Sequence, residues 1–493
     1  MFTEAEADPS LSAAQAQALE LPLRTALLKA QYARLLDPRR ALLIVAAGID
    51  GAGKGATINL LNEWLDPRHI RTLAFGQASP EEAARPPLWR YWNALPAAGR
   101  IGIVFGSWYM PLVREAASKH PDRAAVARQI EDVRQFEATL AASGVQVLKL
   151  WFHLSRDAQR ERTERLLADP ATAWQVTPQD RKVGKRFKRL RGAGQQVIAA
   201  TDVPPAPWVV IPSADERLRT VRTGQAVLQA LRPRHAPRVA HDARPAPERQ
   251  RIADRLARLD YAAHLDKDSY DTELLQWQAR LAHAVRRPAF ARRSLVLAFE
   301  GQDAAGKGGA IRRITHALDA RHYTITPISA PTQEELAHPY LWRFWRRVPA
   351  HGGISIFDRS WYGRVLAERV EQLTAPADWR RGYGEINEFE QQLTESGAVL
   401  LKFWLAVTPD EQLARFQARE KSPFKQFKIT PDDWRNRDKW DAYYQAANEM
   451  FARTDSRHAP WHVIAANDKR HARVEVLKAV VEALEAALDD TDA

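Results

Sequence analysis

The sequence contains no cysteine among its 493 residues. Disulfide bonds, thiolate metal sites and thiol catalysis are therefore excluded. The longest apolar runs, such as residues 41–47, fall far short of the roughly 20 residues that a membrane-spanning helix needs. The acidic stretch at residues 1–17 also lacks the apolar core of a signal peptide. These absences predict a cytoplasmic protein without a membrane partner.

Negative charge is in the minority, because 60 Asp and Glu stand against 72 Lys and Arg, which gives a formal net charge of +12. Such a balance favours an anionic partner: a nucleotide, a phosphate polymer, a nucleic acid or an acidic membrane surface. The 14 histidines form no cluster with metal-ligand spacing, so we expect them to be structural or surface residues. Apolar residues make up 45% of the chain, which is enough for the cores of several domains.

The chain carries one set of motifs twice. GIDGAGKGATI begins at Gly48 and GQDAAGKGGAI at Gly301, 253 residues later. The same spacing separates the two copies of Leu-Trp-Arg, Ser-Trp-Tyr, Phe-Glu, Thr-Pro and Pro-Trp. This pattern indicates a duplicated domain rather than a short-period repeat. We expect a first domain at 1–231, with a loose leader over 1–20, an exposed Pro/Arg/Ala-rich linker at 232–250, and a second domain at 251–493.

Strands and helices alternate within each half. In the second half, five apolar segments predict strands: 295–299, 323–328, 354–357, 399–405 and 461–465. Helical patterns separate them, and in the last helix Leu477, Val480, Val481, Leu484 and Leu488 share one face. The alternation predicts an α/β fold, a parallel sheet flanked by helices, with ligands beyond the carboxyl ends of the strands. Two tandem P-loop kinase-like domains, each with a basic helical lid, fit this pattern.

A strand, a glycine-rich loop and a helix follow one another at residues 295–315. Gly301, Gly306, Gly308 and Gly309 allow main-chain N–H groups to surround phosphate oxygens, and Lys307 adds a full positive charge. This context makes the segment a Walker A loop, and the duplication argues against an incidental glycine-rich turn.

The loop departs from the usual pattern in one respect. The position after Lys307, where such loops carry a Mg²⁺-binding Ser or Thr, is Gly308, while an acid, Asp303, lies inside the loop. We assign Asp303 to holding the metal or to activating the acceptor. Asp358 ends an apolar strand, where a Walker B acid is expected, and Arg359 beside it can contact phosphoryl oxygens. The alternative for Asp358 is a cap on the next helix.

Basic residues crowd the segment 415–439. Such a run predicts a mobile lid that closes on phosphates, although an ordinary solvated basic face is the alternative. Its candidate residues are Arg415, Arg419, Lys421, Lys425 and Lys428. The Arg/Trp segment 342–347 predicts a helix with one packed face and one phosphate-facing basic face, rather than a nucleic-acid site.

The two halves differ at a decisive place. Where the second half has Asp358 and Arg359, the first has Phe105 and Gly106, and its lid loses basic residues as well. The first half keeps Asp50 and the loop lysine Lys54, so it retains part of the phosphate-binding device, but without the second acid it is expected to hold Mg²⁺ poorly. We expect one working site, in the second half.

These residues resemble the polyphosphate kinase 2 family. The family's loop pattern G-x-D-x-A-G-K-G-G appears at 301–309, its D-R-S-W-Y motif at 358–362, and its lid pattern at 415–433. The resemblance implies transfer of the terminal phosphoryl group of inorganic polyphosphate to AMP, giving ADP with Mg²⁺, as in two-domain members of that family.

The resemblance also implies roles for the motif residues. The loop amides and Lys307 bind donor phosphates, Asp303 and Asp358 hold Mg²⁺, and Arg359, Arg415, Arg419 and Lys425 stabilise the transferring group. Arg364 and Glu368 are weak candidates for contacts to the nucleotide.

Three other functions stay open at this point. They are a polyphosphate-dependent nucleoside diphosphate kinase, an ATP-dependent nucleotide kinase, and a polyphosphate- or nucleic-acid-binding protein without turnover. The substrates we expect are inorganic polyphosphate and AMP or ADP, and nucleic acid is disfavoured as a partner. The sequence leaves the oligomeric state open, a homo-oligomer included.

Overall fold

The structure, a computed structural model, describes residues 1–232, 252–424 and 426–492. The chain forms two compact units. Of the described residues, the first comprises Met1–Ala78, 91–232 and Pro331–Trp342, and the second comprises Ser79–Arg90, 252–330 and the described part of 343–492. Each unit therefore takes in a short segment from the other half of the sequence. The expected linker at 232–250 lies outside the described residues except for Arg232.

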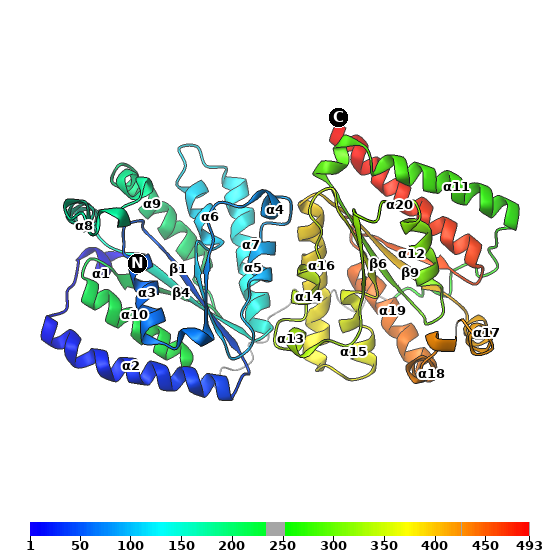
Figure 1. The fold of residues 1–493 in the computed structure, drawn as a ribbon, viewed down its shortest axis with the longest axis horizontal. Helices are drawn as coiled ribbons and strands as arrows, with labels where there is room; N and C mark the ends of the chain where they lie inside the picture. Colours follow the sequence, from blue (N-terminus) through cyan, green and yellow to red (C-terminus); the bar gives the residue numbers. More distant parts are fainter. Residues whose placement is uncertain (233–251, 425, 493) are drawn as a thin grey trace. The chain divides into compact units, whose positions relative to one another are not determined.

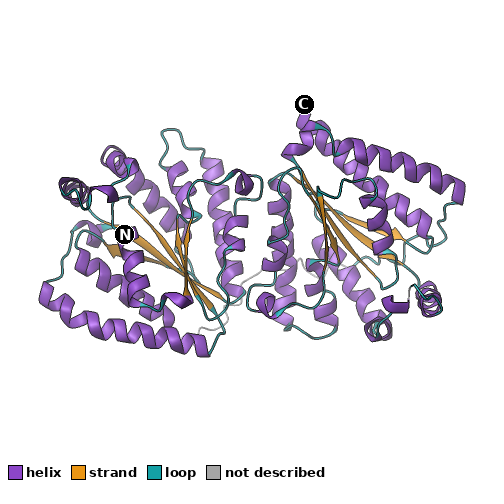
Figure 2. Ribbon diagram, in the orientation of Figure 1, coloured by secondary structure: helices purple, strands orange, loops and turns teal. Residues whose placement is uncertain are grey.

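Each unit is built on a five-stranded parallel sheet (Figure 2). In the first unit the order is β2-β3-β1-β4-β5, with β1 at Ala41–Gly48, β2 at Ile70–Ala74, β3 at Ile101–Phe105, β4 at Val145–His153 and β5 at Trp208–Pro212. In the second it is β10-β9-β6-β8-β7, with β6 at Ser294–Gly301, β7 at Tyr323–Pro327, β8 at Ile354–Asp358, β9 at Ala398–Ala406 and β10 at Trp461–Ala465. The predicted α/β fold with parallel sheets is confirmed.

Helices cover both faces of each sheet (Figure 1). The helices of the first half are α1 Thr3–Glu6, α2 Ala13–Leu36, α3 Lys54–Trp64, α4 Pro80–Ala83, α5 Trp89–Asn93, α6 Tyr109–Ala116, α7 Arg123–Ala142, α8 Arg156–Ala168, α9 Pro178–Thr201 and α10 Glu216–Leu231. Those of the second half are α11 Lys267–Ala284, α12 Lys307–Thr315, α13 Gln333–Leu336, α14 Trp342–Trp345, α15 Ala367–Val370, α16 Pro376–Glu395, α17 Pro409–Glu420, α18 Pro431–Asp438, α19 Trp440–Thr454 and α20 Lys469–Asp492.

The central strand of the second unit shows why its sequence is apolar throughout. β6 lies between β8 and β9, and Leu297 is in register with Ile356 and Leu401. Helices α12 and α20 pack on one side of this sheet and α16 on the other. A strand covered on both faces needs apolar residues at successive positions. The predicted face of α20 is confirmed, because all five of its apolar residues are fully buried in this core.

The N-terminal residues are not the loose leader that their composition suggests. Phe2 is 2% exposed, and its ring stacks on His153 at 3.9 Å between centroids. Glu6 accepts hydrogen bonds from Arg191, and Ser12 forms a capping box that starts α2 at Ala13. The expectation was wrong because isolated side chains, the aromatic Phe2 and the acids Glu6 and Asp8, rather than an apolar run, attach this segment to the first unit.

The same buried ion pair occurs in both units. Lys402 Nζ lies 2.8 Å from Glu390 Oε2, and both side chains are 0% exposed. Glu390 Oε1 also accepts hydrogen bonds from Trp361 and Tyr362. In the first unit Lys149, Glu137, Trp108 and Tyr109 repeat this arrangement. The Ser-Trp-Tyr motif shared by the two halves thus serves the fold, because its aromatic donors satisfy a buried acid.

In the part of the chain that the structure describes, no helix is both long enough and apolar enough to span a bilayer.

Candidate active site

The glycine-rich loop of the second unit connects β6 to α12. Gly301 has φ +134°, and a Cβ there would lie 2.2 Å from the carbonyl oxygen of Leu405, so only glycine fits. Gly306, with φ +114°, precedes the first residue of α12. Lys307 Nζ turns back over the loop and donates to the carbonyl oxygens of Gly301 at 2.7 Å and Gln302 at 3.2 Å. The predicted strand, loop and helix are all present, and the lysine lies over the loop.

Carboxylates from both predicted motifs act electrostatically on Lys307. Burial lowers the pKa of Lys307, while the negative charges of Asp303, Asp358 and Glu300 act to raise it. The pKa of Asp303 is itself lowered, because Lys307 and Arg359 outweigh the effect of burial. Asp303 and Asp358 thus both lie within electrostatic reach of the Lys307 ammonium group.

The Asp303 carboxylate is held from two directions. Arg359 donates to its Oδ1 at 2.8 Å, and the side-chain amide of Asn436, from α18, donates to its Oδ2 at 2.8 Å. Arg359 follows β8, so this contact joins the loop to the D-R-S-W-Y motif. Asn436 did not stand out in the sequence, since a single amide among basic residues carries no recognisable spacing.

Arg359 has a backbone conformation that favours glycine. Its φ is +62°, which costs a non-glycine residue about 1–2 kcal/mol. Its N–H donates to the carbonyl oxygen of Phe299, and the next residue, Ser360, donates from N and Oγ to Glu300. The first copy has Gly106 at this position, with φ +79°. The second copy therefore keeps an arginine where the backbone alone would favour glycine, which is typical of functional positions.

Ser360, rather than Asp358, caps the short helical turn Trp361–Arg364, because the Ser360 side chain accepts from the N–H of Tyr362. The capping alternative for Asp358 is therefore not what the structure shows. Asp358 ends β8 in register with Phe299, one residue before Glu300 and the loop. Its position at the carboxyl end of a central strand is the one predicted for a second acid.

Glu300 is a residue that the sequence reasoning missed. It is 6% exposed, and burial raises its pKa against the opposing effects of Ser360, Lys307 and Arg359. The first copy has Ala47 at the matching position. The available signal was an acid inside an apolar strand, directly before the glycine-rich loop.

Arg415 lies behind the loop rather than in front of it. Its guanidinium donates to the carbonyl oxygens of Ala304, Ala305, Ala466 and Asn467, and to the carboxylate of Glu411. The side chain is 5% exposed. Its donors are directed at the main chain, so this structure gives Arg415 a supporting position, which differs from the expected contact with the transferring group.

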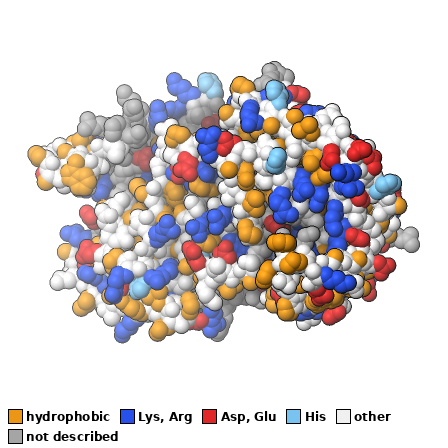
Figure 3. All heavy atoms as spheres, turned by 45° about the vertical axis from the view of Figure 1, so that its right-hand side comes forward, with side chains coloured by type: hydrophobic (Ala, Val, Ile, Leu, Met, Phe, Trp, Pro, Cys, Tyr) orange, Lys and Arg blue, Asp and Glu red, His pale blue; other side chains and the backbone are white. Residues whose placement is uncertain are grey.

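The other predicted lid residues lie on or after α17. Arg419 is one turn beyond Arg415, and Lys421 is exposed at the helix end. Lys425 and the side chain of Lys428 lie outside the described residues. Figure 3 brings the side of the second unit forward and shows several Lys and Arg side chains gathered on it.

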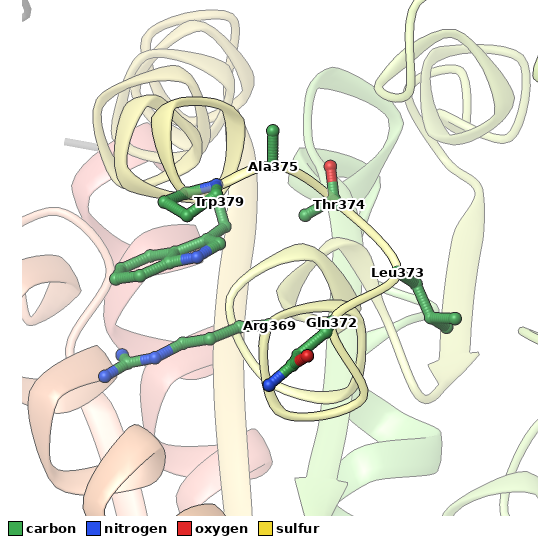
Figure 4. A pocket seen from close by; sticks show the side chains of 7 residues that line it. Arg369, Gln372, Leu373, Thr374, Ala375 and Trp379 are labelled. Atoms are coloured by element: carbon green, nitrogen blue, oxygen red, sulfur yellow. The ribbon is translucent and has the colours of Figure 1, made fainter.

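The weak nucleotide candidates contact each other. Arg364 Nε lies 2.9 Å from Glu368 Oε2, and Arg364 also donates to the Thr374 hydroxyl at 3.1 Å. Thr374 lines a cavity of about 570 Å³ between α15 and α16, in which the Trp379 indole lies 4.3 Å from the Arg369 guanidinium (Figure 4). The cavity is lined by Arg369, Gln372, Leu373, Thr374, Ala375, Pro376 and Trp379.

The first copy keeps the glycine-rich loop, but the side chains that contact the loop are arranged differently. Lys54 Nζ donates to the carbonyl oxygens of Gly48 and Ile49 and pairs with Asp50 at 3.1 Å. Arg219, 1% exposed, fills the space behind Gly53, where a Cβ would lie 2.7 Å from the guanidinium carbon. With Phe105 and Gly106 in place of the acid and arginine, this copy lacks the second half of the site.

The donor chemistry suits a hard divalent cation. Mg²⁺ is usually held by one or two carboxylates together with substrate phosphates, rather than by an all-protein cage. Asp303 and Asp358 supply two carboxylates, and among residues 1–232, 252–424 and 426–492 no group of three His, Asp or Glu could hold a metal alone. The residues fit a metal that arrives with its phosphate ligands.

The sequence profile described as polyphosphate kinase 2 (PPK2) matches residues 10–238 and 264–492, both copies in turn. The chain belongs to the polyphosphate kinase 2 family. The predicted resemblance is thereby confirmed, and the two matches agree with a duplicated family domain.

Relatives match this chain over nearly its whole length. The polyphosphate:AMP phosphotransferase of Pseudomonas aeruginosa is 47% identical over 491 residues, which is 99% of each chain. That of Acinetobacter johnsonii is 42% identical over 94% of this chain and 96% of its own. A crystal structure of a polyphosphate kinase 2 from Pseudomonas aeruginosa PA01 has a TM-score of 0.88 at 45% identity, covering 99% of both chains. Both the sequence and the fold of this polyphosphate kinase 2 protein are thus similar to theirs over nearly their whole length.

Proposed function

We propose that this protein transfers the terminal phosphoryl group of inorganic polyphosphate to AMP, giving ADP, and that the second unit performs the reaction. Full-length relatives that carry the name polyphosphate:AMP phosphotransferase support the choice of substrates. The observation that carries the assignment to the second unit is the contact between Arg359 and Asp303. It joins two motifs that are 56 residues apart, and the first copy cannot form it.

The roles of the residues follow from their positions. The main-chain N–H groups at the start of α12 and the Lys307 ammonium bind phosphate oxygens of the polymer. An oxygen of the AMP phosphate forms a bond to the terminal phosphorus, while the bond to the bridging oxygen breaks and leaves a polymer one unit shorter. Arg359 stabilises charge on the transferring group, since its guanidinium lies beside the loop acid.

Asp303 and Asp358 would hold Mg²⁺, which when bound supplies positive charge to the phosphoryl oxygens. Arg364 and Glu368 stay candidates for contacts to the nucleotide, supported by the adjacent cavity. Arg419 and Lys421, with Lys425 and Lys428, remain the proposed phosphate contacts of the lid. Phosphoryl transfer of this kind depends on positioning and charge neutralisation more than on a covalent nucleophile.

Two variants test the assignment to one unit. Asp358→Asn removes a carboxylate from the second unit and is expected to abolish ADP formation from AMP, polyphosphate and Mg²⁺. Lys54→Ala, in the loop of the first unit, is expected to leave most of the activity. Loss of activity in the Lys54 variant, with its fold intact by circular dichroism, would refute a single working site.

The choice of acceptor and donor is tested separately. The protein is incubated with Mg²⁺, with either polyphosphate or ATP as donor, and with each of AMP, ADP and GMP in turn, and the nucleotides are separated by chromatography. We expect ADP from AMP. Product formed only with ATP as donor would contradict the proposal, and product formed only from ADP would favour a nucleoside diphosphate kinase.

A further inference from the structure

One acid, Glu371, anchors the segment that contains the lid helix α18. Lys439 Nζ donates to Glu371 Oε2 at 2.7 Å, and Arg435 Nε lies 3.4 Å from the same oxygen. The Tyr443 hydroxyl lies 3.4 Å from Glu371 Oε1. The Glu371 side chain is 13% exposed, whereas those of Lys439 and Arg435 are 39% and 51% exposed. A mostly buried carboxylate therefore gathers donors from a segment that is itself near the surface.

Asn436 lies between the two cations that Glu371 holds. Its amide nitrogen donates to Asp303 Oδ2 at 2.8 Å, and its amide oxygen lies 3.3 Å from the Tyr443 hydroxyl. The Tyr443 proton can serve either Asn436 or Glu371, so the three groups form one connected network. A donor on one side and an acceptor on the other define which way the amide faces.

The network ends at the acid that the proposed reaction needs. With Asn436 on Oδ2 and Arg359 on Oδ1, both oxygens of Asp303 have a donor. The last turn of α18 is also held by a second element, because Arg437, two residues after Arg435, donates to the side chain of Gln412 on α17 at 3.1 Å. The position of α18 thus determines how the loop carboxylate is oriented.

Comparison of the two copies distinguishes this network from the buried contacts that stabilise the fold. The first copy has Ser118, Val183 and Leu190 where the second has Glu371, Asn436 and Tyr443. It nevertheless keeps the whole buried arrangement around Lys149 and Glu137. A network needed only for stability would be expected in both copies, as that ion pair is. This one accompanies Asp358 and Arg359, which are also found only in the second copy.

We propose that Glu371 and Asn436 are positioning residues for phosphoryl transfer. Glu371 fixes α18 through Lys439 and Arg435, and Asn436, carried on that helix, orients the Asp303 carboxylate when the lid lies over the loop. This inference rests on the proposed function. If the Asp303 carboxylate is already oriented before the substrates react, the free energy needed to orient it does not add to the activation barrier in each reaction cycle.

The kinetic test uses Glu371→Gln, Asn436→Ala and the double variant in the full-length protein. Each single change is expected to lower kcat for ADP formation by about tenfold, as loss of an outer-shell partner typically does, and to raise the Mg²⁺ concentration for half-maximal rate. KM for AMP stays within about twofold, because neither residue is assigned to the nucleotide. The double variant should be no slower than the slower single variant, since both residues act through one network.

A matched control tests whether the loss of a different acid that pairs with Arg435 has the same effect. Asp432→Asn removes an exposed acid that pairs with Arg435 at 2.8 Å but leaves Glu371 in place. It is expected to retain kcat and the Mg²⁺ dependence of the unchanged protein. Limited trypsin digestion gives a readout without turnover: Glu371→Gln should speed cleavage within residues 421–439, and Asp432→Asn should not.

Several outcomes would overturn the proposal. Losses that multiply in the double variant, a Glu371→Gln variant with normal kcat and Mg²⁺ dependence, or an effect on KM for AMP alone would each do so. If the unchanged protein makes no ADP, the proposed function fails. The digestion experiment then still decides whether Glu371 holds the lid, because it needs no substrate. If Glu371→Gln does not fold, Asn436→Ala on the partly exposed helix provides the kinetic test.

Discussion

Replacing Lys402 by Met should destabilise the second unit strongly. Lys402 Nζ contacts Glu390 at 2.8 Å, the Tyr362 hydroxyl at 2.9 Å and the carbonyl oxygen of Thr454 at 2.6 Å. Lys402 and Glu390 are both 0% exposed, so the acid would remain buried without its cation. Breaking such a pair from one side costs about 3–5 kcal/mol.

The first unit supplies a matched measurement. Lys149 has the same partners, with Glu137 at 2.8 Å, the Tyr109 hydroxyl at 3.0 Å and the carbonyl oxygen of Thr201 at 2.7 Å. Lys149→Met should therefore cost a similar free energy of unfolding, while Lys119→Met, on an exposed side chain, should cost less than about 0.5 kcal/mol.

The assay is differential scanning calorimetry combined with ADP formation. A loss of 3–5 kcal/mol lowers the Tm of a unit of this size by about 6–20 °C. At a temperature where both variants are folded, Lys402→Met should reduce turnover, because Tyr362 lies in the D-R-S-W-Y motif, whereas Lys149→Met should not. A loss below about 1 kcal/mol in both variants would refute the reasoning about the buried pair.

Three further predictions concern the N-terminal segment, the first copy and the loop. Hydrogen bonding to Arg191 lowers the pKa of Glu6 from 4.5 to about 2; the stabilisation is present above pH 4.5 and is lost as the pH falls towards 2, so thermal unfolding followed by circular dichroism should show Glu6→Gln to be less sensitive to acid over that range. Gly106→Arg should misfold the first unit rather than create a second site, because a Cβ there would lie 1.9 Å from the carbonyl oxygen of Phe75, and a well-folded variant by circular dichroism would contradict this. Arg415→Ala should lower the free energy of unfolding by about 2–4 kcal/mol in urea denaturation, since it leaves buried carbonyl oxygens without donors; an unchanged stability with lost turnover would instead return this residue to phosphate binding.

Local patterns in the sequence predicted much of the fold. The apolar segments predicted the strands correctly, because a parallel strand covered on both faces has few polar positions. The same reasoning missed the docking of residues 1–12, since Phe2 and Glu6 act through partners such as His153 and Arg191, more than 140 residues away. It also overestimated the Arg/Trp helix, which is only the four-residue α14 with its aromatic side chains buried.

The sequence by itself determined the duplication, the two phosphate loops and the loss of Asp358 and Arg359 from the first copy, because these are matters of residue identity at fixed spacing. Only the tertiary structure decided what individual side chains contact. In the folded chain Arg415 donates to main-chain carbonyl oxygens, and Glu300 accepts hydrogen bonds from Ser360. Asn436 contacts Asp303, which is 133 residues away in the sequence. The sequence does not show which partner a charged or amide side chain contacts. That partner depends on which strand ends and helices lie next to each other in the folded sheet.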